Sequence, residues 1–373
     1  MPRVLIVFGT RPEAIKMAPL VRMLDEHPAF DAVTCVTAQH REMLDQVLDW
    51  FRITPDYDLD LMQPNQTLAG LTARALQGIT NVIEQVQPDV VLSQGDTTTA
   101  MTAALAAFYQ RVPVGHVEAG LRTGDIYNPF PEEVNRHLIG VMANYHFAPT
   151  TTARDALLAE NIDPANVFVT GNTVLDALQW TVAQPHTLDL GVPLDAPGEQ
   201  LVLVTAHRRE SFGAEFEAIC HALRAIAERN PSVRLVYPVH LNPNVQEPVH
   251  RILGGVERVH LIKPLAYPDF AHLMNRAHLV ITDSGGLQEE APALGKPVLV
   301  MRRTTERPEA VEAGVAKLVG TDTDVIVRAA ERLLHDEDAY DAMATAVSPF
   351  GDGHAAEYIA DVLVKSLAEG RAG

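Results

Sequence analysis

Cysteine and long apolar runs are both scarce in this chain. Only two of the 373 residues are cysteine, Cys35 and Cys220. Two are too few for a disulfide framework or for a metal site built from several cysteines. No stretch approaches the ~18 apolar residues that a membrane-spanning helix needs, and Val4–Phe8 is too short for a signal-peptide core. We therefore expect a soluble, cytoplasmic protein that does not associate with membranes.

Basic residues are also in short supply. The chain has 29 Lys and Arg against 48 Asp and Glu, which gives a formal net charge of −19. So acidic a surface repels phosphate backbones and anionic lipids, which argues against nucleic acid or a membrane as a partner. It does not exclude a small basic pocket for a phosphorylated metabolite. Because 47% of the residues are hydrophobic and 21% are charged, the composition is that of a globular protein.

Several common ligand-binding motifs are absent from the sequence. It contains neither a GxGxxG fingerprint for a dinucleotide nor a GxxxxGK[ST] loop for a nucleoside triphosphate. It also contains no HExxH pair and no acidic calcium loop. We therefore expect no cofactor, neither a nicotinamide nor a tightly bound catalytic metal.

Short β-branched runs alternate with longer amphipathic segments along the whole chain. The strands expected in the first half are Val4–Phe8, Ala32–Thr37, Val90–Ser93, Val114–His116, Tyr145–Ala148 and Val167–Thr170. Those expected in the second half are Leu201–Thr205, Leu235–Pro238, Val259–Ile262, Leu279–Thr282 and Val298–Met301. The helices expected between and after them include Arg41–Phe51, Leu68–Gln85, Thr98–Tyr109, Ala153–Glu160, Phe216–Glu228, Pro268–Asn275 and Ala355–Leu367. This alternation predicts right-handed βαβ units and parallel sheets covered on both faces.

A segment rich in proline and glycine interrupts the pattern between residues 184 and 199 and has little periodicity, which is typical of a linker. We therefore predict an N-terminal Rossmann-like domain over residues 1–183, a linker over 184–199 and a C-terminal Rossmann-like domain over 200–353. The fold class is α/β, with two doubly wound domains facing a central cleft. Ligands of such sheets lie beyond the carboxyl ends of the strands, so the chemistry is expected in the loops there.

Charged residues follow three strands of the first half. Arg11 and Lys16 come after the first strand and supply positive charge near a helix start, where anions bind. Asp96 comes after the third expected strand, although aspartate is also a common helix cap. Glu118 follows a short buried strand, where an unpaired acid is costly unless it has a partner or a function. Glu132 lies at a predicted helix start, where an acid stabilises the helix dipole in any case. Carboxylates from three loops are thus expected at one edge of one sheet.

The second half has its own candidate loops. His207 and Arg208 follow its first strand, and His240 occupies the equivalent place one strand later. A lone histidine is more often structural, but one beside arginines at a strand end suits the binding of a phosphate. The SGG sequence at residues 284–286 opens a helix, so its backbone N–H groups are available to an anion.

These loops also resemble those of a known family. The segments that carry the likeness are FGTRPEAIKMAPL (8–20), TAQHREMLDQV (37–47), GDTTT (95–99), GHVEAGLRTGD (115–125), PEEVNR (131–136), AHRRESFG (206–213), YPVHLNPNV (237–245), TDSGGLQEEAPALGKPVLV (282–300) and TTERPEAV (304–311). In this order they resemble the non-hydrolysing UDP-N-acetylglucosamine 2-epimerases over nearly the whole chain. The resemblance implies a glycosyltransferase-B type fold, a homodimer, and interconversion of UDP-GlcNAc and UDP-ManNAc without a required metal or NAD. It also implies that the final helix, about residues 354–373, packs back on the first domain.

The matched motifs imply roles for particular residues. The implied active-site groups are Asp96, Glu118, Glu132 and His207. The residues implied to bind the nucleotide sugar are Arg11, Lys16, Leu265, Phe270, Ser284, Gly285, Gly286, Glu290 and Arg307. Some members bind a second UDP-GlcNAc as an allosteric activator, at positions that match Gln39, Glu132, Arg208 and His240. Glu42 and Asn65 depart from the Gln and Arg of strongly regulated members, and Leu265 stands where some members have Gln.

The chemistry of this substrate agrees with the residues. Carbon 2 of N-acetylglucosamine is not adjacent to a carbonyl, so direct removal of its proton gives no stabilised carbanion. Because the sequence lacks a dinucleotide fingerprint, oxidation at carbon 3 is disfavoured and elimination of UDP, with re-addition through a 2-acetamidoglucal, is expected. The product would supply cell-surface polysaccharide precursors. A glycosyltransferase of the same fold, a hydrolysing epimerase and a non-catalytic nucleotide-sugar sensor stay open as alternatives.

Overall fold

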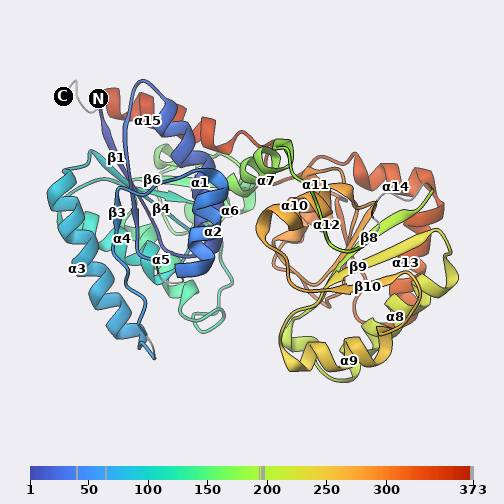
Figure 1. The fold of residues 1–373 in the computed structure, drawn as a ribbon. Coiled ribbons are helices and arrows are strands. Elements are labelled where there is room, and N and C mark those ends of the chain that lie inside the picture. The colour runs from blue at the N-terminus through green and yellow to red at the C-terminus, as the bar shows by residue number, and fades with distance from the viewer. Residues whose placement is uncertain (39–40, 64, 193, 195–197, 370–373) are drawn as a thin grey trace. The chain divides into compact units, whose positions relative to one another are not determined.

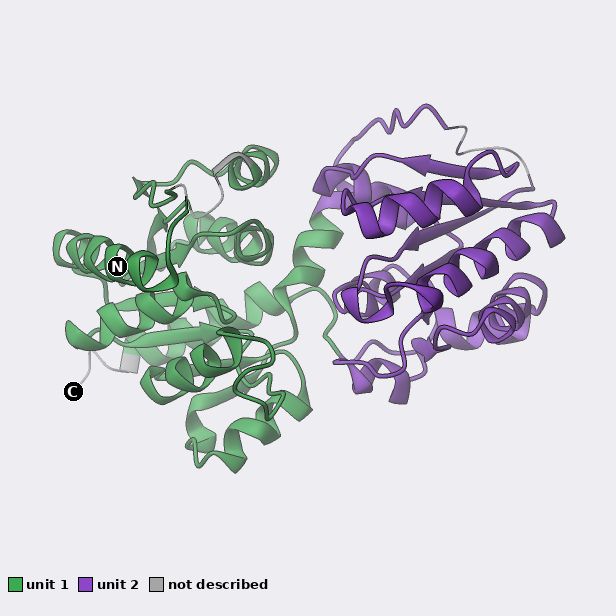
Figure 2. Ribbon diagram, turned by 90° about the horizontal axis from the view of Figure 1, so that it is seen from below, with its two compact units in different colours: residues 1–180, 350–373 green, residues 181–349 purple. Residues whose placement is uncertain are grey.

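The chain folds into two compact units, which Figure 2 shows in different colours. The computed structural model describes residues 1–38, 41–63, 65–192, 194 and 198–369. The first unit comprises Met1–Trp180 together with Phe350–Gly373, and the second comprises Thr181–Pro349.

The first unit is built on a seven-stranded parallel sheet with the strand order β3-β2-β1-β4-β5-β6-β7 (Figure 1). Its strands are β1 (Arg3–Phe8), β2 (Asp31–Val36), β3 (Tyr57–Asp58), β4 (Val90–Gln94), β5 (Val114–Val117), β6 (Tyr145–Ala148) and β7 (Val167–Val169). Its helices are α1 (Arg11–Glu26), α2 (Arg41–Phe51), α3 (Leu68–Val86), α4 (Thr98–Tyr109), α5 (Glu132–Met142), α6 (Thr151–Ala159), the short η1 (Pro164–Asn166), α7 (Thr173–Ala183), which runs into the second unit, and α15 (Ala355–Glu369). The strand order reverses between β1 and β4, as in doubly wound folds.

The second unit repeats this architecture with a six-stranded parallel sheet in the order β10-β9-β8-β11-β12-β13. Its strands are β8 (Gln200–Thr205), β9 (Val233–Pro238), β10 (Val259–Ile262), β11 (Leu279–Thr282), β12 (Val298–Val300) and β13 (Ala316–Leu318). Its helices are the short η2 (Arg209–Ser211), α8 (Ala214–Arg229), α9 (Pro243–Leu253), α10 (Tyr267–Arg276), α11 (Leu287–Ala293), α12 (Pro308–Glu312), α13 (Thr323–His335) and α14 (Glu337–Ala344). Here the order reverses between β8 and β11.

The prediction of two doubly wound α/β domains is confirmed, and burial explains why. In central strands such as β1 and β8, half of the residues are β-branched and the inner positions are apolar and covered by helices on both faces, so these positions are hidden from solvent. Two edge strands were not predicted. β3 has two residues and β13 has three, one of them the exposed Lys317, so neither is long enough to show a period. No helix in the described part of the chain has the length and apolarity to cross a membrane.

The second unit begins at Thr181 and so includes the described residues of the segment predicted as a linker over 184–199. Near the two ends of that segment, His186 Nε2 lies 2.7 Å from Asp269 Oδ1 and Arg234 Nε donates to Glu199 at 2.7 Å. Helix α15 belongs to the first unit and packs against α1. The N–H groups of its first two residues donate to the carboxylate of Asp176 in α7, at 3.2 and 2.8 Å.

Two buried histidines lie side by side in the first sheet. His116 of β5 pairs in register with His146 of β6, and each is 1% exposed. The Nε2–H of His116 donates to the carbonyl oxygen of Gly95 at 2.7 Å, so its Nδ1 carries no proton in the neutral ring. Neither Nδ1 atom has a hydrogen-bond partner among the described residues. Burial lowers the pKa of both histidines to about 4.

We expect this histidine pair to make the protein sensitive to acid. An unfolded histidine titrates near pH 6.5, so between pH 6.5 and 4 the unfolded state binds more protons and stability falls as the pH falls. From pH 7.5 to 5.0 each histidine should account for a loss of about 2 kcal/mol in the free energy of unfolding. Urea unfolding at the two pH values checks this with His116→Gln, whose amide can still donate to Gly95. Equal losses in wild type and variant would contradict the assignment.

Candidate active site

The loops at the carboxyl ends of the strands that flank each reversal of strand order form two candidate ligand sites. In the first unit β1 and β4 lead into Arg11 and Asp96. In the second unit β8 and β11 lead into His207 and Ser284. Ligands of doubly wound sheets bind at such reversal points. The structure therefore places residues predicted from the sequence at both of them.

Glu118 lies at the end of β5 and is held from three sides. Lys16 Nζ donates to its two carboxylate oxygens at 2.6 and 2.7 Å. Gln94 donates to Oε2, and Asn172 Nδ2 donates to Oε1 at 3.0 Å. The side chain is only 5% exposed, and the backbone at Glu118 has a φ of 63°, a left-handed conformation that costs a non-glycine residue energy. Such a fixed, strained carboxylate at a strand end is typical of a functional group.

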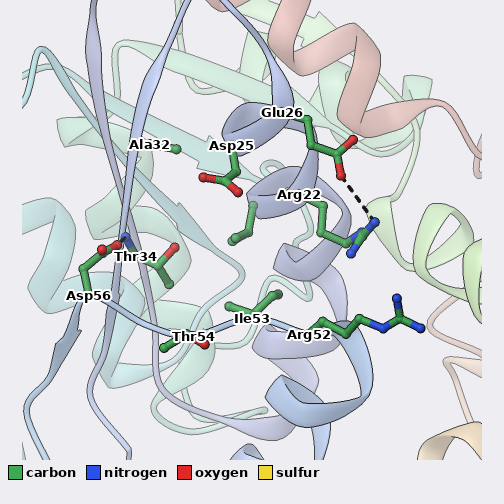
Figure 3. Close-up of a pocket in the computed structure, with 10 residues that line it drawn as sticks. Arg22, Asp25, Glu26, Ala32, Thr34, Arg52, Ile53, Thr54 and Asp56 are labelled. Carbon is green, nitrogen blue, oxygen red and sulfur yellow. Dashed lines mark hydrogen bonds and ion pairs between the residues drawn. The ribbon is translucent and has the colours of Figure 1, made fainter.

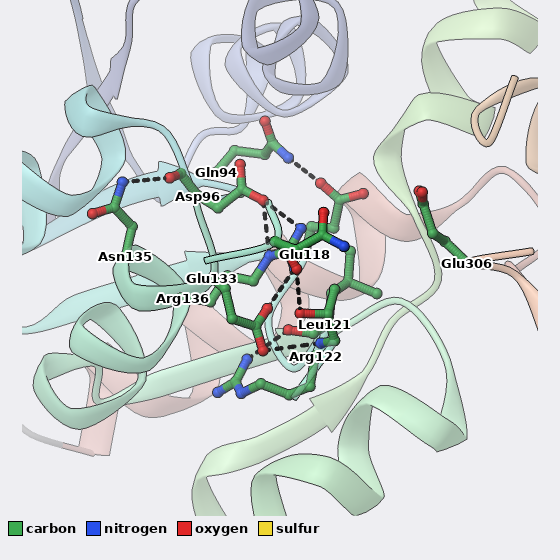
Figure 4. A network of polar contacts seen from close by, with 12 residues as sticks. Gln94, Asp96, Glu118, Leu121, Arg122, Glu133, Asn135, Arg136 and Glu306 are labelled. Carbon is green, nitrogen blue, oxygen red and sulfur yellow. Dashed lines mark hydrogen bonds and ion pairs between the residues drawn. The ribbon is translucent and has the colours of Figure 1, made fainter. Parts of the chain in front are cut away.

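Asp96 is connected to the same region through Arg136 of α5 (Figure 4). Arg136 donates to Oδ2 of Asp96 from Nε at 2.8 Å and from Nη2 at 2.7 Å. Its third nitrogen, Nη1, donates to Glu133 at 2.8 Å. A Cβ atom added at Gly95 would lie 3.8 Å from Glu118 Oε2, so the Asp96 loop adjoins Glu118. The structure thus brings two of the three predicted acids of the first unit together.

Glu133 anchors this network from inside the protein. Its side chain is 0% exposed, and it accepts the N–H groups of Thr123 and Gly124 at 2.9 and 3.0 Å. Burial acts to raise the pKa of Glu133, but these two N–H groups and Arg136 outweigh it and hold that pKa below its usual value. The neighbouring Glu132, the third predicted acid, is half-buried at the first position of α5. Arg136 therefore has one fixed ionic partner and presents its other donors to Asp96.

A third buried acid ties the two loops of the first reversal point together. Glu13 is 1% exposed and accepts the N–H groups of Gly9 and Thr10 at 3.1 and 2.8 Å. Its other oxygen accepts the hydroxyl of Thr97 at 2.6 Å. Burial raises the pKa of Glu13 although these bonds act to lower it. Glu13 therefore fixes the backbone just before Arg11 to the loop that carries Asp96.

In the second unit His207 stands at the end of β8 among three charged or titratable groups. Its ring stacks on the ring of His240, with centroids 5.2 Å apart and an interplanar angle of 11°. Its backbone N–H donates to Asp283 Oδ2 at 2.6 Å, and the N–H of Arg208 donates to the same oxygen at 2.7 Å. Burial lowers the pKa of His207; the Asp283 carboxylate opposes this, whereas His240 and Arg208 add to it.

The SGG loop follows β11 and presents open backbone. A Cβ atom added at Gly286 would meet nothing within 4 Å, and one at Gly285 would approach Glu306 and Arg208 no closer than 3.5 Å. Ser284 N–H donates to the Thr282 hydroxyl at 2.9 Å, which fixes the start of the loop. The loop therefore leaves room for a ligand to approach its backbone.

Three comparisons with known proteins identify the family. A profile described as UDP-N-acetylglucosamine 2-epimerase matches residues 22–364. The UDP-N-acetylglucosamine 2-epimerase of Escherichia coli (strain K12) is 59% identical over 97% of this chain and 98% of its own. The chain belongs to this family. It is therefore an isomerase of the nucleotide-sugar 2-epimerase type.

Solved structures of the family cover the chain equally well. The UDP-GlcNAc 2-epimerase from Neisseria meningitidis, bound to UDP-GlcNAc, is 47% identical, has a TM-score of 0.86 and covers 97% of this chain and 100% of its own. The S. aureus MnaA–UDP co-structure is 46% identical, has a TM-score of 0.86 and covers 99% of this chain and 97% of its own. The recognition of the epimerase family from sequence motifs is thus confirmed.

The other residues that the family resemblance predicts to bind a ligand have the following positions. Leu265 and Phe270 are half-buried, before and within α10. The guanidinium of Arg307 donates to Glu289, whereas the acid predicted to bind ribose is the next residue, Glu290, which is half-buried. Arg208 Nη1 lies 3.7 Å from Glu306 Oε1. Gln39 lies outside the described residues.

Several residues that the structure places in the candidate site carried no predicted role. They are Glu13, Gln94, Glu133, Arg136, Asn172 and Asp283. Two sequence signals were available, the T-x-x-E capping box of Thr10 with Glu13 and the i,i+3 spacing of Glu133 with Arg136. Within the described ranges, no group of three or more His, Cys, Asp or Glu side chains is arranged to hold a metal ion.

One polar pocket of the first unit is lined by none of these residues (Figure 3). It has a volume of about 160 Å³ and is lined by the last turns of α1, by β2 and by residues 52–56. Its polar groups bond to one another: Arg22 to Glu26 at 3.4 Å, and the Thr34 N–H to Asp56 at 2.8 Å. It lies toward the amino ends of the strands, so we assign it no part in the reaction.

Proposed function

We propose that this protein interconverts UDP-GlcNAc and UDP-ManNAc by eliminating UDP and adding it back through 2-acetamidoglucal. The observation that carries the proposal is Glu118, a buried carboxylate that a strained backbone and three donors hold at the end of a strand. The Neisseria meningitidis relative, which binds UDP-GlcNAc, supports the identity of the substrate. No redox step is needed because carbon 2 inverts through an alkene.

The proposed steps balance without another reactant. The bond between carbon 1 and the UDP oxygen breaks and its electron pair leaves with UDP. A carboxylate removes the proton from carbon 2, and the electrons of that C–H bond form the double bond between carbons 1 and 2. A second acid then protonates carbon 2 on the opposite face, and UDP attacks carbon 1 again. Asp96, Glu118 and Glu132 are the proposed proton-transfer groups.

Lys16 could control the basicity of Glu118 in this scheme. In the structure its ammonium neutralises Glu118, and a carboxylate paired with a cation is a weak base. We propose that the diphosphate of the substrate attracts Lys16, together with Arg11, and so leaves Glu118 more basic. The base would then be active only when the leaving group is present.

The second unit would hold the nucleotide. Its SGG loop offers backbone to the diphosphate, with Arg307 as a further cation and Glu290 as the acid for the ribose hydroxyls. Leu265 and Phe270 would contact the uracil side, and His207 would face the phosphate. Variants of the first unit's carboxylates Asp96 and Glu118 should therefore lose turnover while keeping affinity for UDP, which isothermal titration measures.

Further proposals follow from the family resemblance alone. They are a homodimer in the cytoplasm, a product that feeds cell-surface polysaccharide, and allosteric activation by a second UDP-GlcNAc through Gln39, Glu132, Arg208 and His240. The mass in solution, measured by light scattering, tests the dimer. A sigmoidal dependence of rate on UDP-GlcNAc concentration tests the activation.

Proton NMR in deuterated water tests the proposed reaction. With UDP-GlcNAc alone, we expect UDP-ManNAc to appear and deuterium to enter carbon 2 of both epimers, at a rate that EDTA does not change. A glycosyltransferase would show no reaction without an acceptor, and a hydrolysing epimerase would release free ManNAc and UDP. A sensor would bind UDP without exchange at carbon 2. Activity that EDTA abolished and only a divalent ion restored would also contradict the proposal.

A further inference from the structure

Asp283 is a buried carboxylate with one oxygen in use and one free. It follows β11 and is 1% exposed. Its Oδ2 atom accepts the backbone N–H groups of His207 and Arg208 at 2.6 and 2.7 Å. Its Oδ1 atom has no hydrogen-bond partner among the described residues. A buried acceptor without a partner costs free energy, so an unused carboxylate oxygen at a candidate active site suggests a partner that forms in another state.

The free oxygen lies beside the ring of His207. The distance from Asp283 Oδ1 to His207 Nδ1 is 3.6 Å, too long for a hydrogen bond but within reach of a small ring rotation. The backbone around the ring is fixed, because Tyr237 OH donates to the carbonyl of Ala206 at 2.6 Å and the hydroxyls of Thr205 and Thr282 are 2.6 Å apart. With Nδ1 next to Asp283, the other ring nitrogen, Nε2, stays available to a ligand.

The groups around His207 act in opposite directions on its pKa, which lies below its ordinary value. Burial favours the neutral ring, Asp283 favours the protonated ring, and His240, stacked on it, and Arg208 favour the neutral ring. Arg208 in turn lies 3.7 Å from Glu306. A bound diphosphate would add two or more negative charges next to this group and so shift the balance toward the imidazolium.

We infer that Asp283 is the positioning residue of His207 and that His207 takes up one proton from solvent when a nucleoside diphosphate occupies the loop at residues 284–286. The protonated ring then donates Nδ1–H to Asp283 Oδ1 and Nε2–H to a phosphate oxygen. In the reaction this cation stabilises the charge on the departing UDP. The inference rests on the proposed function, because it takes the diphosphate to bind at this loop.

Isothermal titration with UDP at pH 7.5, in two buffers of different ionisation enthalpy, measures the proton uptake. We expect roughly 0.5 to 1 proton per UDP for the wild type, since a ring that is neutral when free becomes charged when bound. Asp283→Asn keeps an oxygen for the two N–H groups and so places the amide NH₂, which cannot accept Nδ1–H, against Nδ1. It should abolish most of the uptake and weaken UDP binding about tenfold. Asp336→Asn is the matched control, because the Asp336 carboxylate likewise accepts a backbone N–H, that of Ala339 in the same unit, and lies 3.8 Å from Arg332.

If Asp283→Asn does not fold, NMR of the wild-type protein still tests the inference. The Cε1 resonance of His207, assigned by its loss in His207→Asn, should move to the imidazolium position on addition of UDP at pH 7.5. UDP binding with no proton uptake and no such shift would overturn the inference alone. Uptake that persists in a folded Asp283→Asn would overturn the role of Asp283. Absence of UDP binding to the wild type would overturn this inference together with the proposed nucleotide site.

Discussion

Glu118→Gln should reduce turnover of UDP-GlcNAc by roughly 100- to 10,000-fold, because an amide cannot take the proton from carbon 2. The substitution preserves the shape of the side chain, and Lys16 can still donate to its one remaining oxygen. Affinity for UDP should therefore change by less than about threefold. Initial rates by NMR and titration with UDP provide the two measurements.

Glu160→Gln is the matched control for this experiment. Glu160 is also held by a cation, with Arg122 Nε at 2.7 Å and Nη2 at 2.8 Å, and we assign it no part in the reaction. Its rate should stay within about twofold of wild type, since a partly exposed ion pair contributes little to stability. If Glu118→Gln turned over UDP-GlcNAc as fast as this control, Glu118 would be a structural residue.

Asp96→Asn should cause a loss of similar size, roughly 100- to 10,000-fold in turnover, for a different geometric reason. Arg136 donates twice to Oδ2 of Asp96, which leaves Oδ1 to face a ligand. In the variant Arg136 would hold the amide oxygen, so the NH₂ group would occupy the position of the proton acceptor. Steady-state rates with each epimer check the loss. Asp89→Asn, at a half-buried aspartate that accepts the N–H of Arg3, is the control.

The two variants should also differ from each other. If Glu118 and Asp96 act on opposite faces of carbon 2, each variant keeps the base for only one epimer. Each should then form 2-acetamidoglucal and UDP from one epimer and not from the other, which single-turnover NMR detects. Full activity of Asp96→Asn with both epimers would exclude Asp96 as a proton-transfer group and leave it as the partner of Arg136.

The sequence predicted the positions of those candidate residues that lie at the end of a strand or in the few residues after it. The apolar runs before Gly9, Gly95, Glu118, His207 and Asp283 are local patterns, and parallel pairing places their carboxyl ends at common sheet edges. The sequence could therefore predict, together with the fold, which loops lie at each reversal of strand order.

It failed where a residue acts through a partner far along the chain. Asn172 is 54 residues from Glu118, and Arg136 is 40 residues from Asp96, so no spacing rule connects them. The burial of a side chain at a helix start could not be predicted from the sequence either. Glu132 and Glu133 are neighbours there, but only Glu133 is buried, and it accepts hydrogen bonds from backbone N–H groups. The family resemblance implies an active-site role for Glu132 beside Asp96 and Glu118, and that role stays a proposal.

The placement of α15 has a consequence for how the protein is made. The ribosome synthesises the whole second unit, Thr181–Pro349, before it reaches the helix that packs on α1 and meets Asp176. The second unit, being one continuous segment, can fold during translation, whereas the first must wait with part of α1 uncovered. The unit that carries Asp96 and Glu118 is therefore the later one to mature.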